Sequence, residues 1–462
     1  MSRIRQRATR VLLQIGPKFL PFADAATDDL PLSRLLRLSL FQVSVGMALV
    51  LLIGTLNRVM IVELEVPASI VAVMISMPLL FAPFRALVGF SSDNYRSALG
   101  WRRVPYIFRG TMVQFGGLAM MPFALLVLSG TGHAQEWPVW VGWLGAGGAF
   151  LFVGAGLHTV QTAGLALATD LAPVESQPKV VGLMYVMLLV GMIASSIIFG
   201  VLLADFSPAK LIQVIQGSAV VTIVLNGIAI WKQESRNPLR AAQAPSKPSF
   251  AQSWAGFTEG GDANRRLLAI GLGTMGFSME DVLLEPYGGQ ILHLTVGTTT
   301  ALTATLAIGG LLGFWLASRI LSRGTDPFRM ASAGALVGIG AFGSVISAAS
   351  FHSPWLFGAG ALFIGFGAGL FGHGTLTATM NKAPPGQVGL ALGAWGAVQA
   401  TAAGLAVALG GILRDIVANM PDRQVLGPAT GYVFVYALEV ALLVLTLLAM
   451  VPLLRRRTVL TA

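Results

Sequence analysis

The sequence contains no cysteine and few charged residues, and both absences narrow what the protein can be. Without cysteine there are no disulfides, no thiolate nucleophile and no cysteine-ligated metal site. Charged residues make up only 11% of the 462 residues, whereas soluble domains carry about 25%. So small a charged fraction cannot cover the apolar surface of a soluble protein of this length. The composition therefore excludes a soluble fold.

Long polar stretches are also scarce, and apolar runs of about 20 residues, enough to cross a bilayer as a helix, recur along the whole chain. Twelve spans are predicted, at 36–62, 67–90, 104–128, 138–166, 180–203, 210–231, 266–292, 298–321, 329–349, 354–380, 388–413 and 430–454. No cleavable signal peptide is recognisable, so we expect the first run to remain as an anchor. The chain is predicted to be an all-α integral membrane protein with twelve transmembrane helices.

The longest polar stretch, 232–264, holds three prolines and predicts a cytoplasmic linker between two six-helix bundles. The bundles would occupy 36–231 and 265–454, after a cytoplasmic arm at 1–35 and before a basic cytoplasmic tail at 455–462. For the arm, a simple lead-in to the first span, an interfacial amphipathic segment and a partner-binding segment remain alternatives.

The two halves repeat in sequence. LFVGAG at 151–156 resembles LFIGFG at 362–367, and at the same offset Asp170 in DLAP corresponds to Asn381 in NKAP. A parallel repeat of two six-helix units is the architecture of major facilitator folds. The 55 glycines, well above the usual share of about 7%, would let the helices approach closely.

The distribution of lysine and arginine predicts that both termini are cytoplasmic. In that orientation, 24 of the 30 basic residues lie in cytoplasmic segments and two, Arg85 and Arg109, lie within spans. The outside loops hold four, namely Arg58, Lys210, Arg414 and Arg423. The net charge of +10 is therefore a topology signal and a source of attraction to anionic lipid. It does not indicate nucleic-acid binding.

The loop after the second span resembles the loop signature of the major facilitator superfamily. It contains Gly89, Asp93, Gly100, Arg102 and Arg103, with a longer insert between Asp93 and Gly100 than is usual. We expect a tight cytoplasmic turn in which Asp93 pairs with nearby arginines. A loop that only pins two helices would contain the same residues.

Three acidic residues, Glu280, Asp281 and Glu285, lie close together in the seventh span. Carboxylates inside a membrane are costly and mark proton relays or bound cations. The alternative is an interfacial helix end, where Pro286 and Gly288-Gly289 would break the helix.

Four further polar residues are predicted within or near spans: Asn57, Arg58, Arg85 and Arg109. The arginines would either extend their long side chains to the membrane surface or face the bundle interior and bind an anionic group.

Two of the five histidines, His158 and His373, lie beside glycines in the fourth and tenth spans. The glycines leave room for a flat macrocycle, so each imidazole is a candidate ligand for the magnesium of a chlorin ring. A helix-packing role is the alternative. No metal-binding cluster, nucleotide-binding loop or catalytic signature is present, so an enzyme is not expected.

The segments at 21–64 and 81–130, together with TDLAP at 169–173 and NKAPP at 381–385, resemble the PucC/LhaA family of photosynthetic bacteria. This resemblance implies an assembly factor for light-harvesting antenna complexes in the inner or intracytoplasmic membrane. Its implied partners are antenna polypeptides, the lipid bilayer, and bacteriochlorophyll as cargo or the machinery that makes it. A proton-coupled secondary transporter and a ligand-free scaffold remain alternative functions.

Overall fold

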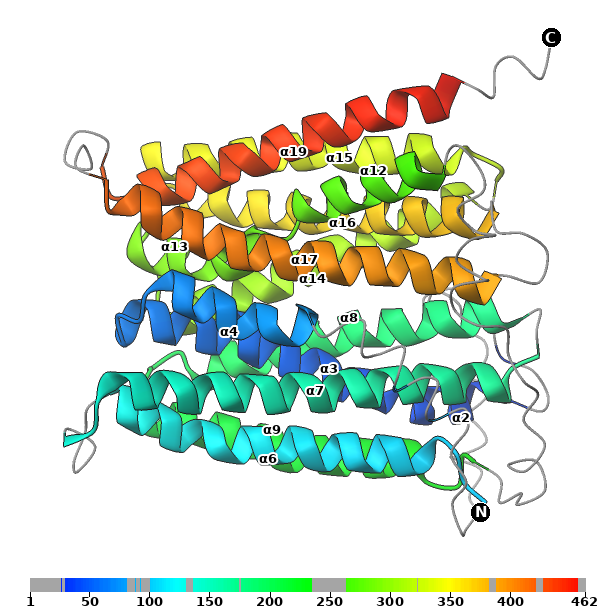
Figure 1. Ribbon diagram of the computed structural model, residues 1–462, viewed down its shortest axis with the longest axis horizontal. Helices are drawn as coiled ribbons and strands as arrows, with labels where there is room; N and C mark the ends of the chain where they lie inside the picture. Colours follow the sequence, from blue (N-terminus) through cyan, green and yellow to red (C-terminus); the bar gives the residue numbers. More distant parts are fainter. Residues whose placement is uncertain are drawn as a thin grey trace, which may run out of the picture.

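The computed structural model describes residues 26, 30–80, 88, 92, 100–129, 136–173, 176–234, 263–321, 323–381, 388–420 and 427–455. Within these residues the chain is helical and has no strand. The long helices lie side by side and roughly parallel to one another (Figure 1). Eleven helical stretches are long and apolar enough to cross a bilayer, which confirms the all-α membrane fold.

The helices of the first half follow the six spans predicted there. Their bounds are α2 Leu32–Leu38, α3 Leu40–Leu49, η2 Val50–Leu56, η3 Val59–Glu63, α4 Ala68–Leu80, α6 Val104–Leu128, α7 Val139–Leu171, α8 Gln177–Leu202 and α9 Pro208–Ile230. The first four continue one another as a single span, which becomes π-helical at η2 and η3. The α4 helix is the first part of the predicted span at 67–90, of which 81–87 lie outside the described residues.

The helices of the second half follow the other six predicted spans. Their bounds are α12 Ala263–Met275, η6 Glu280–Val282, α13 Leu284–Gln290, α14 Val296–Leu321, α15 Pro327–Ser350, α16 Pro354–Asn381, α17 Val388–Ala418 and α19 Thr430–Arg455. The division of the chain into an arm, two bundles and a linker stays a prediction, because 1–25 and 235–262 lie outside the described residues.

The seventh span is broken, although not where the sequence suggested. Pro286 and Gly288-Gly289 lie inside α13, and the break comes earlier, between Met275 and Glu280. Proline is tolerated in the first turn of a helix because its missing N–H needs no partner there. A β-carbon at Gly288 would lie 3.1 Å from the Phe357 ring, so glycine here permits close packing instead of ending the helix.

Alternating helix directions bring the helix ends together at two faces of the bundle (Figure 1). The basic face, with Arg102 and Arg103, holds the ends of α7, α9, α14 and α16. The opposite face holds the ends of η3, α6, α8, α13, α15 and α17.

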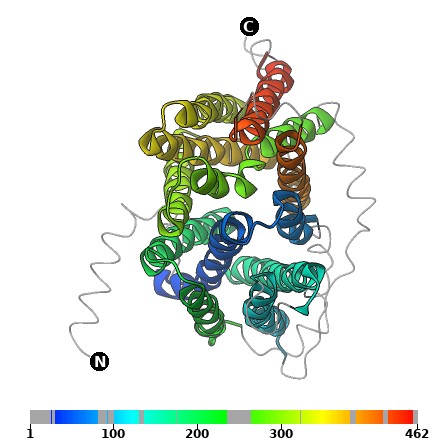
Figure 2. The ribbon, with the colours of Figure 1, turned by 90° about the vertical axis from the view of Figure 1, so that its left-hand side faces the viewer.

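The two halves of the chain pack against each other through two pairs of helices. Seen from the opposite face, α2–α9 lie below α12–α19 (Figure 2), and α4 contacts α17 while α8 contacts α14. A β-carbon at Gly411 would lie 2.6 Å from the Ala68 carbonyl oxygen, and one at Gly297 would lie 2.6 Å from that of Gly200. Small residues therefore let backbones of opposite halves touch.

Glycine also sets the packing of α14 on α16. A β-carbon at Gly365 would clash with the Leu306 carbonyl, whereas one at Gly358 of the same helix would meet no atom within 4 Å. We expect Gly365→Ala to destabilise the protein by about 1–3 kcal/mol through overpacking, and Gly358→Ala to raise stability by up to about 1 kcal/mol through the higher helix propensity of alanine. Thermal unfolding of the two variants in detergent checks this, and equal melting temperatures would contradict it.

Candidate functional site

At the opposite face, polar contacts join the π-helical part of the first span to the second half; we call these contacts the seam. The seam consists of Thr55 Oγ1 to Thr300 Oγ1 at 3.3 Å, Asn57 Nδ2 donating to the Val282 carbonyl at 2.9 Å, and Arg58 Nη2 donating to the Leu294 carbonyl at 3.1 Å. All three side chains of the first span are buried. Hydrogen bonds made away from water are strong, and broken ones are costly.

The seam shows where the side chains of Asn57 and Arg58 lie and what they bind. Both side chains are buried within the bundle. Arg58 also forms an ion pair with Glu63, the last residue of the first span. The charge count from the sequence placed Arg58 outside although the predicted span 36–62 includes it, and the structure places Arg58 within the first span.

Glu285 lies at the seam. One of its carboxylate oxygens accepts a hydrogen bond from Thr303, and the same oxygen faces Gly54 of the first span, where a side chain would collide with it. The other oxygen, Oε2, is buried without a hydrogen-bond partner. Glu285 and Glu280 are thus inside the protein, at 4% and 2% exposure, and only Asp281 is partly exposed.

A second polar junction joins α4 to α17 at the same face. Asp415 Oδ2 accepts the backbone N–H of Ser69 at 2.7 Å, while its Oδ1 pairs with Arg414 at 2.8 Å. Arg414 in turn donates to Gln290 at 2.6 Å. Arg414 therefore lies within α17 and not in an outside loop, as the sequence suggested. The two junctions together close the opposite face between the halves.

A cavity of about 320 Å³ lies between the halves on the other side of the seam, in the part of the bundle nearer the basic face. Tyr185 of α8 lines it from the first half, and Phe277, Phe371 and Trp395 line it from the second. Polar side chains of Thr274, Ser278 and Gln399 also line it, and the Thr274 hydroxyl is buried without a hydrogen-bond partner. A cavity that combines aromatic rings with polar groups can hold a small molecule and fix its orientation.

A groove of about 380 Å³ lies between α4, α7 and α17, in the part of the bundle nearer the opposite face. Its walls are almost entirely apolar and include Met74, Met77 and Trp143, with Gly147 and Gly148 between them. Leu144 and Val73 beside it are exposed on the outer surface of the bundle. The groove therefore opens toward the lipid and not toward the inter-half cavity.

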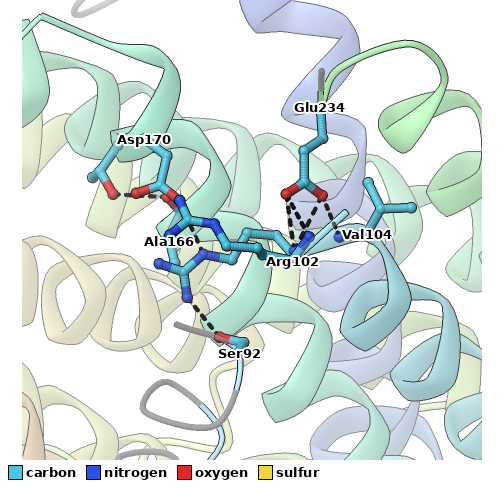
Figure 3. Close-up of polar contacts among 8 residues, drawn as sticks. Ser92, Arg102, Val104, Ala166, Asp170 and Glu234 are labelled. Carbon is cyan, nitrogen blue, oxygen red and sulfur yellow. Dashed lines mark hydrogen bonds and ion pairs between the residues drawn. The ribbon is translucent and has the colours of Figure 1, made fainter. Parts of the chain in front are cut away.

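At the basic face, acidic side chains hold the start of α6 in place (Figure 3). The Glu234 carboxylate, just after α9, accepts the backbone N–H groups of Arg102 at 2.7 Å and Val104 at 2.9 Å. Asp170 at the end of α7 pairs with Arg103 Nε at 3.0 Å, and Arg103 Nη1 donates to Ser92 at 2.6 Å. The free N–H groups of a helix start favour negative charge. This cluster ties α6, α7 and α9 together.

The loop signature is only partly visible. Gly100 has a φ of +75°, a left-handed conformation that favours glycine, as expected of a tight turn. Arg102 and Arg103 both pair with Asp170 of α7, and Arg103 also donates to Ser92 of its own loop. Gly89, Asp93 and Arg85 lie outside the described residues.

The remaining candidates from the sequence do not gather at one site. Arg109 is exposed on α6, 6.0 Å from the Tyr106 ring centre, and does not face the bundle interior. Asn381 is exposed at the end of α16. His158 of α7 is half-buried, and the His373 ring lies 4.3 Å from the Phe314 ring. Neither histidine lines the cavity or the groove.

Three acidic residues with clear structural partners escaped the sequence analysis: Glu234, Asp415 and Glu439. Each accepts a backbone N–H at or near the start of another helix. Of the three, only Glu439 could have been found from the sequence, because it is a lone acidic residue within an apolar span.

The sequence matches the family described as PUCC protein over residues 55–458. The chain belongs to this family. A relative in Cereibacter sphaeroides named "Protein PucC" is 60% identical over 455 residues, 98% of each chain. A second "Protein PucC", from Rhodovulum sulfidophilum, is 64% identical over 90% of this chain and 92% of its own. A more distant relative, "Bacteriochlorophyll synthase 44.5 kDa chain" of Rhodobacter capsulatus, is 25% identical over 86% of this chain and 91% of its own.

Solved transporter structures resemble this PucC-family chain in fold. A POT family transporter in complex with a thioalcohol-conjugated peptide has a TM-score of 0.67 at 11% identity, covering 94% of this chain and 100% of its own. A bacterial homologue of the iron transporter ferroportin, in an inward-facing state, has a TM-score of 0.65 at 15% identity, covering 91% and 98%. These similarities confirm the major-facilitator-like fold and carry no further functional assignment.

Crosslinking tests whether the seam is closed in this PucC-family protein. Because the chain has no cysteine, Thr55→Cys with Thr300→Cys introduces the only two thiols, at positions whose hydroxyls lie 3.3 Å apart. We expect a disulfide to form under mild oxidation, which blocks maleimide labelling of the subsequently denatured protein until reductant is added; labelling follows denaturation because both positions are buried in the fold. Thr55→Cys with Thr298→Cys is the control, since Thr298 is exposed on the same helix. Thiols that react equally in both pairs after oxidation would contradict a closed seam.

The basic-face cluster makes a separate prediction about stability. Arg103 is buried and bonded to Asp170 and Ser92, so Arg103→Gln should lower stability by about 1–3 kcal/mol. Arg109→Gln, one and a half turns further along α6 and exposed, should have no effect of that size. Thermal unfolding of the two variants side by side decides between them, and an equal loss would show that the cluster is unimportant.

Proposed function

We propose that this chain is a non-catalytic assembly factor for bacterial light-harvesting complexes that binds or delivers bacteriochlorophyll within the membrane. The observation that carries the proposal is the nearly full-length match to PucC proteins, joined by a relative named as a chain of bacteriochlorophyll synthase. The antenna polypeptides and the inner or intracytoplasmic membrane are part of this proposal. The proposal also places the basic face and both termini in the cytoplasm, as the distribution of lysine and arginine predicts.

The lipid-facing groove supports a cargo that arrives from the bilayer. Bacteriochlorophyll combines a flat ring with a long hydrocarbon chain and is largely insoluble in water, so it would reach the protein laterally. The groove offers apolar walls from Met74, Met77 and Trp143, and Gly148 has no atom within 4 Å of where its side chain would begin. A flat apolar group could therefore lie against the glycines without displacing side chains.

The histidines remain candidate pigment ligands in this proposal, although they lie away from the groove. His373 packs on Phe314 of α14, and His158 is half-buried on α7. Magnesium ligation by either would place the ring between helices and leave the groove for another part of the pigment. Substituting each histidine separately tests this arrangement.

Proton-coupled transport is the second candidate function, and one observation favours it. The inter-half cavity lies on one side of a closed seam, which is the geometry expected of a carrier open toward one face. A cavity of about 320 Å³ lies at the lower end of the range for small-molecule sites, about 300–1,000 Å³. Transport would therefore concern a molecule smaller than a whole pigment.

Pigment binding is tested by the absorption spectrum of the protein after gentle purification from a pigment-making host. We expect a bacteriochlorophyll band that co-elutes with the protein after antenna complexes are removed. Gly148→Phe should fill the groove and reduce the pigment-to-protein ratio several-fold. Gly116→Phe is the matched control, because Gly116 also has no neighbour within 4 Å but lies on α6 away from the groove.

His158→Ala and His373→Ala extend the same measurement. Loss of the band, or a shift of its wavelength, in one of them would identify a magnesium ligand. A colourless wild-type protein that still co-purifies with antenna polypeptides would overturn pigment binding but keep an assembly role. A wild-type protein that is colourless and does not co-purify with antenna polypeptides would overturn the assembly role as well and favour proton-coupled transport.

A further inference from the structure

Two buried acidic residues, neither of which lines the cavity or the groove, are joined in the interior of the second half. Glu439 lies in the middle of α19 and is fully buried, and Glu280 begins η6 and is 2% exposed. Glu439 Oε1 accepts the backbone N–H of Glu280 at 2.8 Å. The second oxygen, Oε2, is buried and has no hydrogen-bond partner. An unpaired buried carboxylate oxygen is strongly unfavourable, so its environment needs an explanation.

The walls around this acidic pair are aromatic. Tyr436 lies one turn before Glu439 on α19 and is fully buried, and its hydroxyl also lacks a hydrogen-bond partner. This phenol is within electrostatic range of both Glu439 and Glu280. The Tyr287 ring lies 5.5 Å from the Tyr436 ring in an edge-on arrangement. The Tyr436 hydroxyl and Glu439 Oε2 are thus both buried without a hydrogen-bond partner, one turn apart on α19.

No cation balances the pair within the part of the chain that the structure describes. Asp281 of η6 adds a further negative group nearby. Arg414 of the neighbouring helix α17 is engaged by other partners, namely Asp415, Gln290 and Tyr432. The arginines of α12 and α15, at positions 265, 266 and 329, lie toward the basic-face ends of those helices.

We propose that the Glu280–Glu439 pair is a proton-binding site. A proton taken from water joins one carboxylate oxygen, most directly Oε2 of Glu439, and converts the carboxylate into a neutral carboxylic acid. The acid keeps the Oε1 contact with the Glu280 N–H and gains an O–H donor one helical turn from Tyr436. One proton thus removes one of the pair's two uncompensated charges and gives Oε2 a hydrogen, which no described side chain does.

The position of the pair gives proton binding a mechanical consequence. Glu280 is the first residue of the turn η6, and Val282 of the same turn accepts the seam hydrogen bond from Asn57. Phe277, just before the turn, lines the inter-half cavity. A charge appearing at Glu439 would therefore act on the short segment that connects the cavity to the seam. The proton site is inferred from this geometry alone and holds whichever cargo the protein carries.

Infrared spectroscopy of the purified full-length protein at neutral pH tests the proposal directly. We expect a C=O stretching band of a protonated carboxylic acid that is lost or shifted in Glu439→Gln or Glu280→Gln. Asp205→Asn is the control, because the Asp205 side chain is 98% exposed and should leave the band unchanged. Glu285→Gln measures separately any contribution of the seam carboxyl, which is also buried with an unpartnered oxygen.

Two results would overturn the proposal: a wild-type protein without such a band, or a band that persists in both Glu439→Gln and Glu280→Gln. If those two variants do not fold, Tyr436→Phe replaces them, because it removes only the neighbouring hydroxyl and should shift the band. An unshifted band in folded Tyr436→Phe would then count against the site. A pigment-free preparation gives the same readout, so failure of the pigment proposal and failure of the proton site are distinguishable.

Discussion

A backbone N–H group inside a bilayer must find its acceptor within the protein, and in this chain distant carboxylates repeatedly provide it. Glu439 accepts the N–H of Glu280 at the broken seventh span, and Asp415 accepts that of Ser69 at the start of α4. Glu234 does the same for the start of α6 at the basic face. Each carboxylate comes from a helix far away in the sequence, so each bond also fixes how two helices pack.

The broken span shows how this constraint reaches the functional regions. Because α12 stops at Met275, Phe277 follows the helix end and lines the inter-half cavity. The Val282 carbonyl is available to Asn57 because the residue four positions on is Pro286, which has no N–H to donate to it. One short segment therefore supplies a wall of the cavity and an acceptor for the seam. The cavity wall at Phe277 and the seam acceptor at Val282 are only five positions apart in the chain, so a movement of this segment would affect both.

The two cavities suit different kinds of molecule. The groove faces the lipid and has hardly any polar lining, so it suits the apolar part of an amphiphile. The inter-half cavity is lined by aromatic rings together with the polar side chains of Thr274, Ser278 and Gln399, and it lies inside the bundle. A facilitator-like fold that serves antenna assembly would use the groove, whereas a solute carrier would use the inter-half cavity. The proton site lies in the second half, at the segment 277–282 that lines the inter-half cavity and contacts Asn57 of the first half.

The sequence by itself determined the class of fold. Apolar runs placed the membrane helices, because a bilayer requires about 20 apolar residues per span, and the likeness of 151–156 to 362–367 indicated two related halves. The tight turn at Gly100 and the significance of Glu280 and Glu285 were also readable, since glycine and intramembrane acids are unusual in a specific way.

Only the tertiary structure decided which residues meet. Glu439 lies 159 positions from Glu280, Asn57 lies 225 positions from Val282, and Asp415 lies 346 positions from Ser69. Hydropathy reports where a residue lies relative to the membrane but not which way a helix turns its polar side chain. The break in the seventh span was misplaced for the same reason, because whether Pro286 and Gly288 end a helix depends on the neighbours that pack against it. Helix positions follow from local hydrophobicity, whereas polar partners follow from the packing of helices far apart in the chain.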